Sequence, residues 1–357
     1  MILLFILCFV LGMIGMRRRS EGQDPLAPAV TTSLNGIFVL LVMLTHFYQY
    51  AGKFLSGPLH ASYGSARHWM GQTVVATFLF FSGYGMMEQI QKKGQKYARS
   101  IFKNRLLKVL FHFDLALLLF WIMGLFMGKT ETPLSLLTSF IGWSKLSVGN
   151  SNWFMFATFC LYIVVFAAFY RYDSQNPKRS LWNMTALVFV YILLIAFSPN
   201  GSSRFYNTVF CFVVGMWFSH YKEHFYAFWQ KNNKNYYLSL ALCFVIGTVF
   251  AILCTGHERF DCNLLYNFYS LAVALFFVLL CQKFTFGNPL MRWLGKYTFP
   301  IYILQRIPYI LFRHLGLLAY SRALYFVVCV LSTLLLAVLF QRLTDYLDKL
   351  IFQRKKP

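Results

Sequence analysis

The sequence predicts an all-α integral membrane protein whose helices cross the bilayer many times. Of its 357 residues, 58% are hydrophobic and only 12% are charged, whereas about a quarter of the residues of a soluble domain are charged. The mean hydropathy is +0.55. The apolar stretches are long and continuous, which excludes the alternating pattern of a membrane β-barrel. We therefore expect a polytopic transmembrane helix bundle of about ten helices, plus one extra helix at the N-terminus.

A transmembrane helix needs about 20 mainly apolar residues, and stretches that approach this requirement follow one another along the chain. The expected helices cover residues 1–16, 33–50, 70–88, 108–128, 152–170, 181–198, 206–220, 237–254, 264–281, 298–315 and 323–341. The first differs from an ordinary signal peptide, because Arg17-Arg18-Arg19 follows its apolar run instead of preceding it. We expect it to be a helix whose N-terminus lies outside the membrane.

The basic residues predict the orientation of these helices. If the loop that contains Arg17–Arg19 is cytoplasmic, alternate loops and the C-terminal tail hold most of the 33 Lys and Arg residues, as the positive-inside rule requires. The chain is then a multi-pass cell-membrane protein with its N-terminus outside and its C-terminus in the cytoplasm. Because the formal net charge of +22 lies in loops that flank apolar helices, it indicates contact with membrane lipids and argues against nucleic acid as a partner.

His46 is the residue that points most directly to function. It lies inside the apolar stretch 34–48, where a titratable side chain is rare and tends to face the bundle interior or a wet cavity. An imidazole is also well suited to move protons near neutral pH. A neutral core histidine that donates to a backbone carbonyl would fit the position equally well.

Four further groups of residues accompany His46 in a fixed order along the chain. They are Phe80-Phe81-Ser82-Gly83, Phe102-Lys103-Asn104-Arg105-Leu106-Leu107-Lys108, Asn152-Trp153-Phe154, and Leu294-Gly295-Lys296 continuing to Gln305. Together with Thr45-His46, they resemble the motifs of membrane-bound acyltransferase family 3, whose members transfer acyl groups from acyl-CoA to surface glycans and other acceptors. The resemblance covers residues 31–344. It leaves 1–30 as an extra N-terminal helix with a basic cytoplasmic loop, and 345–357 as a basic cytoplasmic tail.

The resemblance implies that His46 is the catalytic residue and that Arg105, Lys103 and Lys108 bind the acyl donor. A phosphate-rich donor needs such a cluster of cations, and the planar guanidinium of Arg105 can grip phosphate. The alternative is that these residues only anchor the cytoplasmic ends of the helices, which is the interpretation that we prefer for the nearby Lys93.

Five residues are expected to contact substrate or to support the site: Asn35, Ser82, Trp153, Gln305 and Arg306. Asn35 stands where the family usually has a basic residue, 11 positions before the histidine, and Gln305 stands where many members have histidine. Ser82 also fits ordinary small-residue packing, and Trp153 fits an interfacial belt. Because a buried cation needs a partner, Arg306 is expected to meet an anion, a row of carbonyl groups or water. The anion could be Asp114 or an acidic group of the acceptor.

The resemblance further implies the reaction. An acyl group, by resemblance acetyl, would move from acetyl-CoA, a co-substrate, to a hydroxyl of a surface glycan or lipid-linked sugar. No bound cofactor and no metal are expected. At about 1.5 Å per residue, His46 lies roughly 16 Å from Asn35, in the outer half of the membrane. His46 would act as a general base or form a transient acyl-histidine.

Two other classes of function remain compatible with the sequence. In a transporter or channel, His46, Asp114 and Arg306 would form a proton or substrate path, although no inverted repeat supports this. The second alternative class is a structural subunit of an envelope assembly. Separately, Cys254 and Cys262 flank a short loop assigned to the outside, where a disulfide is permitted.

Overall fold

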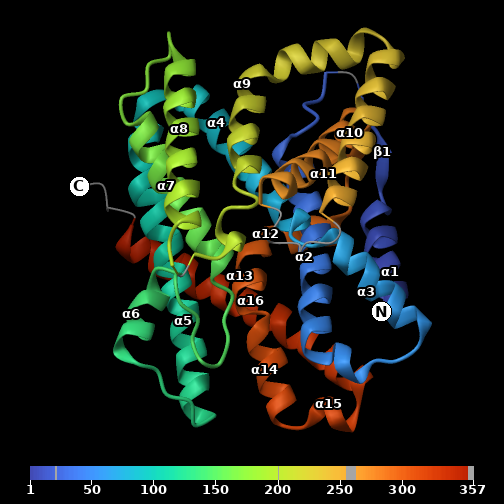
Figure 1. Cartoon of the computed structure of the whole chain (residues 1–357), viewed down its shortest axis with the longest axis vertical. Coiled ribbons are helices and arrows are strands. Elements are labelled where there is room, and N and C mark those ends of the chain that lie inside the picture. Colours follow the sequence, from blue (N-terminus) through green and yellow to red (C-terminus); the bar gives the residue numbers. More distant parts are fainter. Residues whose placement is uncertain (21, 200, 255–262, 353–357) are drawn as a thin grey trace.

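The computed structural model describes residues 1–20, 22–199, 201–254 and 263–352 as an almost entirely helical bundle (Figure 1). Within these residues, six helical segments are long and apolar enough to cross a membrane. They are Pro28–Phe54, Thr73–Phe126, Pro177–Ala196, Asn233–Leu253, Leu265–Lys283 and Arg322–Ile351. Two shorter apolar helices, Ile2–Met13 and Trp153–Phe169, accompany them. The predicted all-α transmembrane class is therefore confirmed.

The elements follow one another in an order close to the predicted one. They are α1 (Ile2–Met13), β1 (Met16–Arg18), α2 (Pro28–Ala51), η1 (Gly52–Phe54), α3 (Pro58–Met70), α4 (Thr73–Ile101), η2 (Phe102–Leu107), α5 (Lys108–Phe126), α6 (Pro133–Phe140), α7 (Trp153–Phe169), α8 (Pro177–Ala196), η3 (Ser203–Phe205), α9 (Phe210–Lys231), α10 (Asn233–Leu253), α11 (Asn263–Lys283), β2 (Phe284–Phe286), α12 (Pro289–Lys296), α13 (Thr298–Leu304), α14 (Arg306–His314), α15 (Leu317–Tyr320) and α16 (Arg322–Ile351).

Helix α2, which carries His46, is held by an unusually close contact with α12. A Cβ atom on Gly36 would lie 1.9 Å from the carbonyl oxygen of Met291, and one on Gly295 would lie 1.8 Å from that of Thr32. Only glycine allows two backbones to approach so closely. Gly295 belongs to the Leu-Gly-Lys motif, so this motif fixes the depth and rotation of α2.

The basic segment between the third and fourth predicted helices is helical, contrary to the prediction of a loop. Gly94 has φ +63° and kinks the chain within α4, and the helix then continues through the π-helical turn η2 into α5. Long basic side chains have a good helix propensity and can extend toward water from a helix in the membrane interface. The clustered cations were therefore a poor indicator of a loop.

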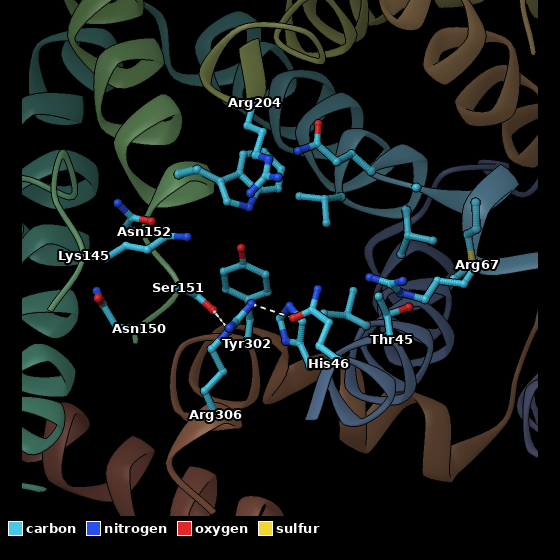
Figure 2. Close-up of a pocket in the computed structure, with 18 residues that line it drawn as sticks. Thr45, His46, Arg67, Lys145, Asn150, Ser151, Asn152, Arg204, Tyr302 and Arg306 are labelled. Carbon is cyan, nitrogen blue, oxygen red and sulfur yellow. Dashed lines mark hydrogen bonds between the residues drawn. The ribbon is translucent and has the colours of Figure 1, made fainter. Parts of the chain in front are cut away.

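The predicted helix 298–315 is divided into two, which corrects the prediction. Helix α13 ends at Leu304, α14 begins at Arg306, and Gln305 forms the junction. Pro308 lacks the N–H group that would donate to the carbonyl of Leu304 in a continuous helix. The break lies beside the cavity described below, and it turns the side chain of Arg306 into that cavity (Figure 2).

The N-terminal segment is shorter than predicted and is attached to the bundle. At about 1.5 Å per residue, α1 is roughly 18 Å long, less than the ~30 Å of a hydrocarbon core. Strand β1 pairs antiparallel with β2, with Met16 opposite Phe286. The Nε of Arg19 then donates to the carbonyl oxygen of Gln282 at 3.0 Å. The loop that we expected after α1 is therefore fixed to the segment that precedes α12.

Candidate functional site

A polar cavity of about 360 Å³ lies where α2, α3, the start of α4, the connection before α7 and the α13–α14 junction meet (Figure 2). His46 and Thr45 enter it from α2, and Tyr302 enters it from α13. Trp153, the first residue of α7, also lines it. The family motifs that carry His46 and Trp153, and the one that ends at Gln305, thus converge on one space.

His46 is partly buried, and its exposed part faces this cavity. Its ring centroid lies 6.4 Å from that of Tyr302. Its Nδ1 is buried and has no hydrogen-bond partner among the residues that the structure describes. The ring nitrogen available to a substrate is therefore Nε2. The alternative of a core histidine that donates to a backbone carbonyl does not match this arrangement.

Gln305 and Tyr302 define the immediate surroundings of the imidazole. The side chain of Gln305 is fully buried next to His46, and its Nε2 donates to the carbonyl oxygen of Tyr302 at 3.2 Å. The hydroxyl group of Tyr302 points into the cavity (Figure 2). Phe154 packs edge-on against the Tyr302 ring, with centroids 5.2 Å apart. Gln305 thus orients its neighbours, while Tyr302 offers a hydroxyl group to a ligand.

Arg306 binds three neutral partners in the cavity wall. Its Nε donates to Ser151 Oγ at 2.9 Å, its Nη1 to the Tyr50 hydroxyl at 3.2 Å, and its Nη2 to Gln49 Oε1 at 3.0 Å. The expected pairing with Asp114 is therefore absent from the described contacts. These three bonds fix the guanidinium without neutralising its charge.

Four cationic side chains line the cavity, and each comes from a different part of the chain (Figure 2). Arg67 lies on α3, Lys145 in the connection between α6 and α7, Arg204 on η3, and Arg306 at the start of α14. No Asp or Glu lies among the described residues of the lining. Burial and then the charges of Arg306 and Arg204 lower the pKa of the Lys145 ammonium group. The cations are thus close enough to act on one another.

Asn35 and Ser82 lie outside the lining of the cavity. Asn35 is partly buried on α2, and its Oδ1 has no hydrogen-bond partner among the described residues. Ser82 precedes Gly83, where a Cβ atom would lie 2.1 Å from the carbonyl oxygen of Phe212 on α9. Gly83 therefore allows α4 and α9 to cross closely, which matches the packing alternative for this motif, and the substrate or support role of Ser82 stays a prediction.

The three residues expected to bind the donor lie at a different depth from His46. Arg105 and Lys103 are exposed on η2, and Arg105 Nε donates to the Tyr97 hydroxyl at 3.3 Å. Arg105 also interacts electrostatically with Tyr162 on α7. Since Tyr162 lies nine residues after Trp153, about 14 Å of helix separates the level of Arg105 from the cavity. The structure keeps this cluster apart from the histidine.

Lys108 is engaged in an ion pair within the bundle. Its Nζ contacts Asp348 Oδ2, and His112 Nε2 lies 2.9 Å from the other carboxylate oxygen of Asp348. Asp348 is buried near the end of α16, which extends to Ile351 and so continues beyond the predicted helix 323–341. This contact joins α5 to α16.

Two further predictions concern residues away from the cavity. Asp114 lies outside the lining, and its Oδ1 is buried without a hydrogen-bond partner among the described residues. Of the proposed transport path, only His46 and Arg306 therefore come together. Cys254 is buried, and Cys262, the other half of the suggested disulfide, lies outside the residues that the structure describes.

Sequence reasoning missed the roles of Tyr302, Arg67, Lys145 and Arg204 in the cavity. Tyr302 lies within the motif that runs from Leu294 to Gln305. Its place in that motif could have indicated a role in the site. The three cations lie in separate connections, each of which carries an unremarkable basic residue. Only the tertiary structure brings them together.

Comparison with known proteins gave one match. A family model described as an acyltransferase domain matches residues 32–342, a range that contains every residue named as lining the cavity. No curated protein and no solved structure matches the chain.

Proposed function

The chain belongs to the acyltransferase-domain family whose model spans residues 32–342, and from this premise we propose that it moves an acyl group from cytoplasmic acyl-CoA to a hydroxyl of an acceptor outside the cytoplasm. The observation that carries the proposal is His46, a histidine on a membrane-spanning helix whose accessible face lines a polar cavity. Acetyl is the proposed acyl group. A surface glycan or lipid-linked sugar is the proposed acceptor.

In the proposed reaction, Nε2 of His46 accepts the proton of the acceptor hydroxyl as its oxygen attacks the thioester carbon. The tetrahedral intermediate collapses, the C–S bond breaks, and the imidazolium returns its proton to the departing thiolate. The Tyr302 hydroxyl, which points into the cavity (Figure 2), can donate a hydrogen bond to the oxyanion. An acyl-histidine on Nε2 is the second route to the same products.

The donor is proposed to enter from the side of η2, where Arg105 and Lys103 are exposed. Their cations would hold its phosphate groups, and its extended thiol arm would reach toward the level of His46. Lys108 is already paired with Asp348, so we assign it the role of holding α5 in place. This arrangement agrees with the proposed topology, in which η2 and the C-terminus face the cytoplasm and the N-terminus lies outside.

Arg105→Ala should weaken acetyl-CoA binding by about tenfold or more, because it removes a charge-assisted contact to phosphate. Lys93→Ala is the matched control. Lys93 is exposed, and its ammonium group lies 5.7 Å from the ring centroid of Tyr97, whose hydroxyl group accepts the hydrogen bond from Arg105. Binding titrations of the purified variants in detergent measure the difference. Equal, small losses of acetyl-CoA affinity in both variants would mean that the basic cluster only anchors the helices at the membrane surface.

The transporter alternative is tested by the same preparations. Purified protein supplied with labelled acetyl-CoA should hydrolyse or transfer the acetyl group slowly if it is an enzyme. A transporter would leave the thioester intact. Comparative mass spectrometry of envelope glycans, with and without the gene, would then identify the acceptor by a lost acyl mass.

A further inference from the structure

Two buried polar atoms beside the cavity belong to neighbouring side chains and complement each other chemically. One is Nδ1 of His46 and the other is Oε1 of Gln305, and neither has a hydrogen-bond partner among the described residues. Both atoms are shielded from the cavity and from solvent. Buried polar groups in native proteins are almost always paired. Because the Gln305 side chain lies within interaction distance of the imidazole, these two atoms can pair with each other after a small rotation.

The other half of the Gln305 amide determines which of its atoms is directed away from Tyr302. Gln305 Nε2 donates to the carbonyl oxygen of Tyr302 at 3.2 Å. Since a carbonyl oxygen can only accept, the NH₂ group must lie on that side, and Oε1 must be directed elsewhere. Gln305 is fully buried and is absent from the lining of the cavity. Its amide oxygen can therefore act on a substrate only through a neighbouring side chain.

An acceptor next to Nδ1 determines where the imidazole carries its proton. In a neutral imidazole, one nitrogen bears the hydrogen and the other bears a lone pair. The hydrogen bond that one nitrogen makes selects between the two tautomers. Because an amide oxygen accepts but cannot donate, it stabilises the form with hydrogen on Nδ1. Nε2 of His46 then presents its lone pair to the cavity, as a general base or a nucleophile requires.

We propose that Gln305 is a positioning residue, which accepts a hydrogen bond from Nδ1 of His46 and so holds the imidazole in the tautomer that makes Nε2 the base. The inference rests on the proposed function and adds to it a residue that does not touch the substrate. The same amide holds the carbonyl group of Tyr302, whose hydroxyl group points into the cavity (Figure 2). Gln305 therefore joins the base to the second group that faces the substrate.

Nitrogen-15 NMR of the full-length protein in detergent, with labelled histidine, determines the tautomer without requiring turnover. The His46 signals are those that disappear in His46→Ala. At about pH 8.5, where an ordinary histidine is neutral, the native protein should carry the proton on Nδ1. Gln305→Leu keeps an apolar side chain in place of the amide and should increase the form protonated on Nε2.

The spectra separate this proposal from the proposed function. A native protein whose His46 is protonated on Nε2, or a Gln305→Leu protein with an unchanged tautomer, would overturn the proposal even if acetyl groups are transferred. The expected tautomers in a protein that transfers nothing would contradict the proposed function alone.

The kinetics of acetyl transfer give a second readout. Gln305→Leu should lower kcat by about tenfold or more, because the wrong tautomer cannot accept the proton. KM for acetyl-CoA should stay unchanged, since the amide does not contact the donor. Gln305→Glu should retain most of the rate, because a carboxylate oxygen accepts the same bond. Its negative charge stabilises the imidazolium, so the acidic limb of its pH–rate profile should move to higher pH.

Gln341→Leu is the matched control. Gln341 lies on α16 outside the lining of the cavity, and its Nε2 donates to Asp345 of the same helix at 2.8 Å. The change also removes a glutamine hydrogen bond, but it should leave the rate, the pH profile and the His46 tautomer as they are. If Gln305→Leu fails to fold, the native spectrum and Gln305→Glu still decide. Equal losses of rate in Gln305→Leu and Gln305→Glu, with the native pH profile in both, would mean that Gln305 only packs.

Discussion

His46→Ala is expected to reduce acyl transfer by about 10² to 10⁴, the range that a general acid–base catalyst contributes. The substitution removes the only side chain of α2 in the cavity that can accept a proton near neutral pH. Folding should be preserved, because the imidazole borders a cavity and its buried Nδ1 has no hydrogen-bond partner among the described residues. Transfer of labelled acetyl to an acceptor or to water, measured at matched protein concentration, checks the expectation.

His314→Ala is the control for loss of a histidine, since His314 is exposed at the end of α14, away from the cavity. It should retain full activity. A well-folded His46→Ala protein with normal turnover would remove His46 from the mechanism. Rapid quenching of the native protein with labelled acetyl-CoA separates the two routes, because only an acyl-histidine leaves the label on the protein.

Gly36→Val is expected to have the largest effect on folding. Even the first carbon atom of a side chain would lie 1.9 Å from the Met291 carbonyl oxygen, and a backbone oxygen within α12 cannot rotate away. Such overpacking should destabilise the bundle by about 3 kcal/mol. It should also move α2 away from α12 and displace His46. The thermal midpoint and the monodisperse fraction in gel filtration measure the effect.

Gly85→Ala provides the comparison, because Gly85 also lies inside a long helix, α4, but a Cβ atom there meets nothing within 4 Å. That change should be neutral or stabilising by up to about 1 kcal/mol, as alanine favours the helix more than glycine does. A Gly36→Val protein as stable as Gly85→Ala would mean that the α2–α12 contact is loose. The fixed position assigned to His46 would then be wrong.

The sequence predicted the helices well where hydrophobic length alone decides them. The stretches around α2, α8, α10 and α11 were found within a few residues, because an apolar run of this length has few alternatives. The break at Gln305 was not predicted, since a proline in an apolar stretch can kink a helix or end it. The prediction of a loop around η2 was wrong for another reason. A high density of charge marks the membrane boundary but carries no information about backbone conformation.

Prediction of the site succeeded for residues in motifs and failed for residues in connections. His46 could be identified because a titratable residue within an apolar helix can be recognised from the linear sequence alone. Arg204 could not, because an arginine in a polar connection is ordinary until the fold places it beside Lys145 and Arg306. The charge of a cavity depends on which side chains the fold brings together. The order of residues along a single sequence does not show this grouping.

The pairing of β1 with β2 has a consequence for how the chain is assembled during synthesis. The backbone groups of Met16–Arg18 find their partners in Phe284–Phe286, and Arg19 bonds to Gln282, 263 residues later. During synthesis, the backbone groups of β1 and the side chain of Arg19 therefore lack these partners until most of the described chain has been translated and inserted. Helix α1 itself packs on α2 and α3, which follow it closely in the chain, but the strand pairing that joins its C-terminal end to the bundle forms only when the segment between α11 and α12 has been made.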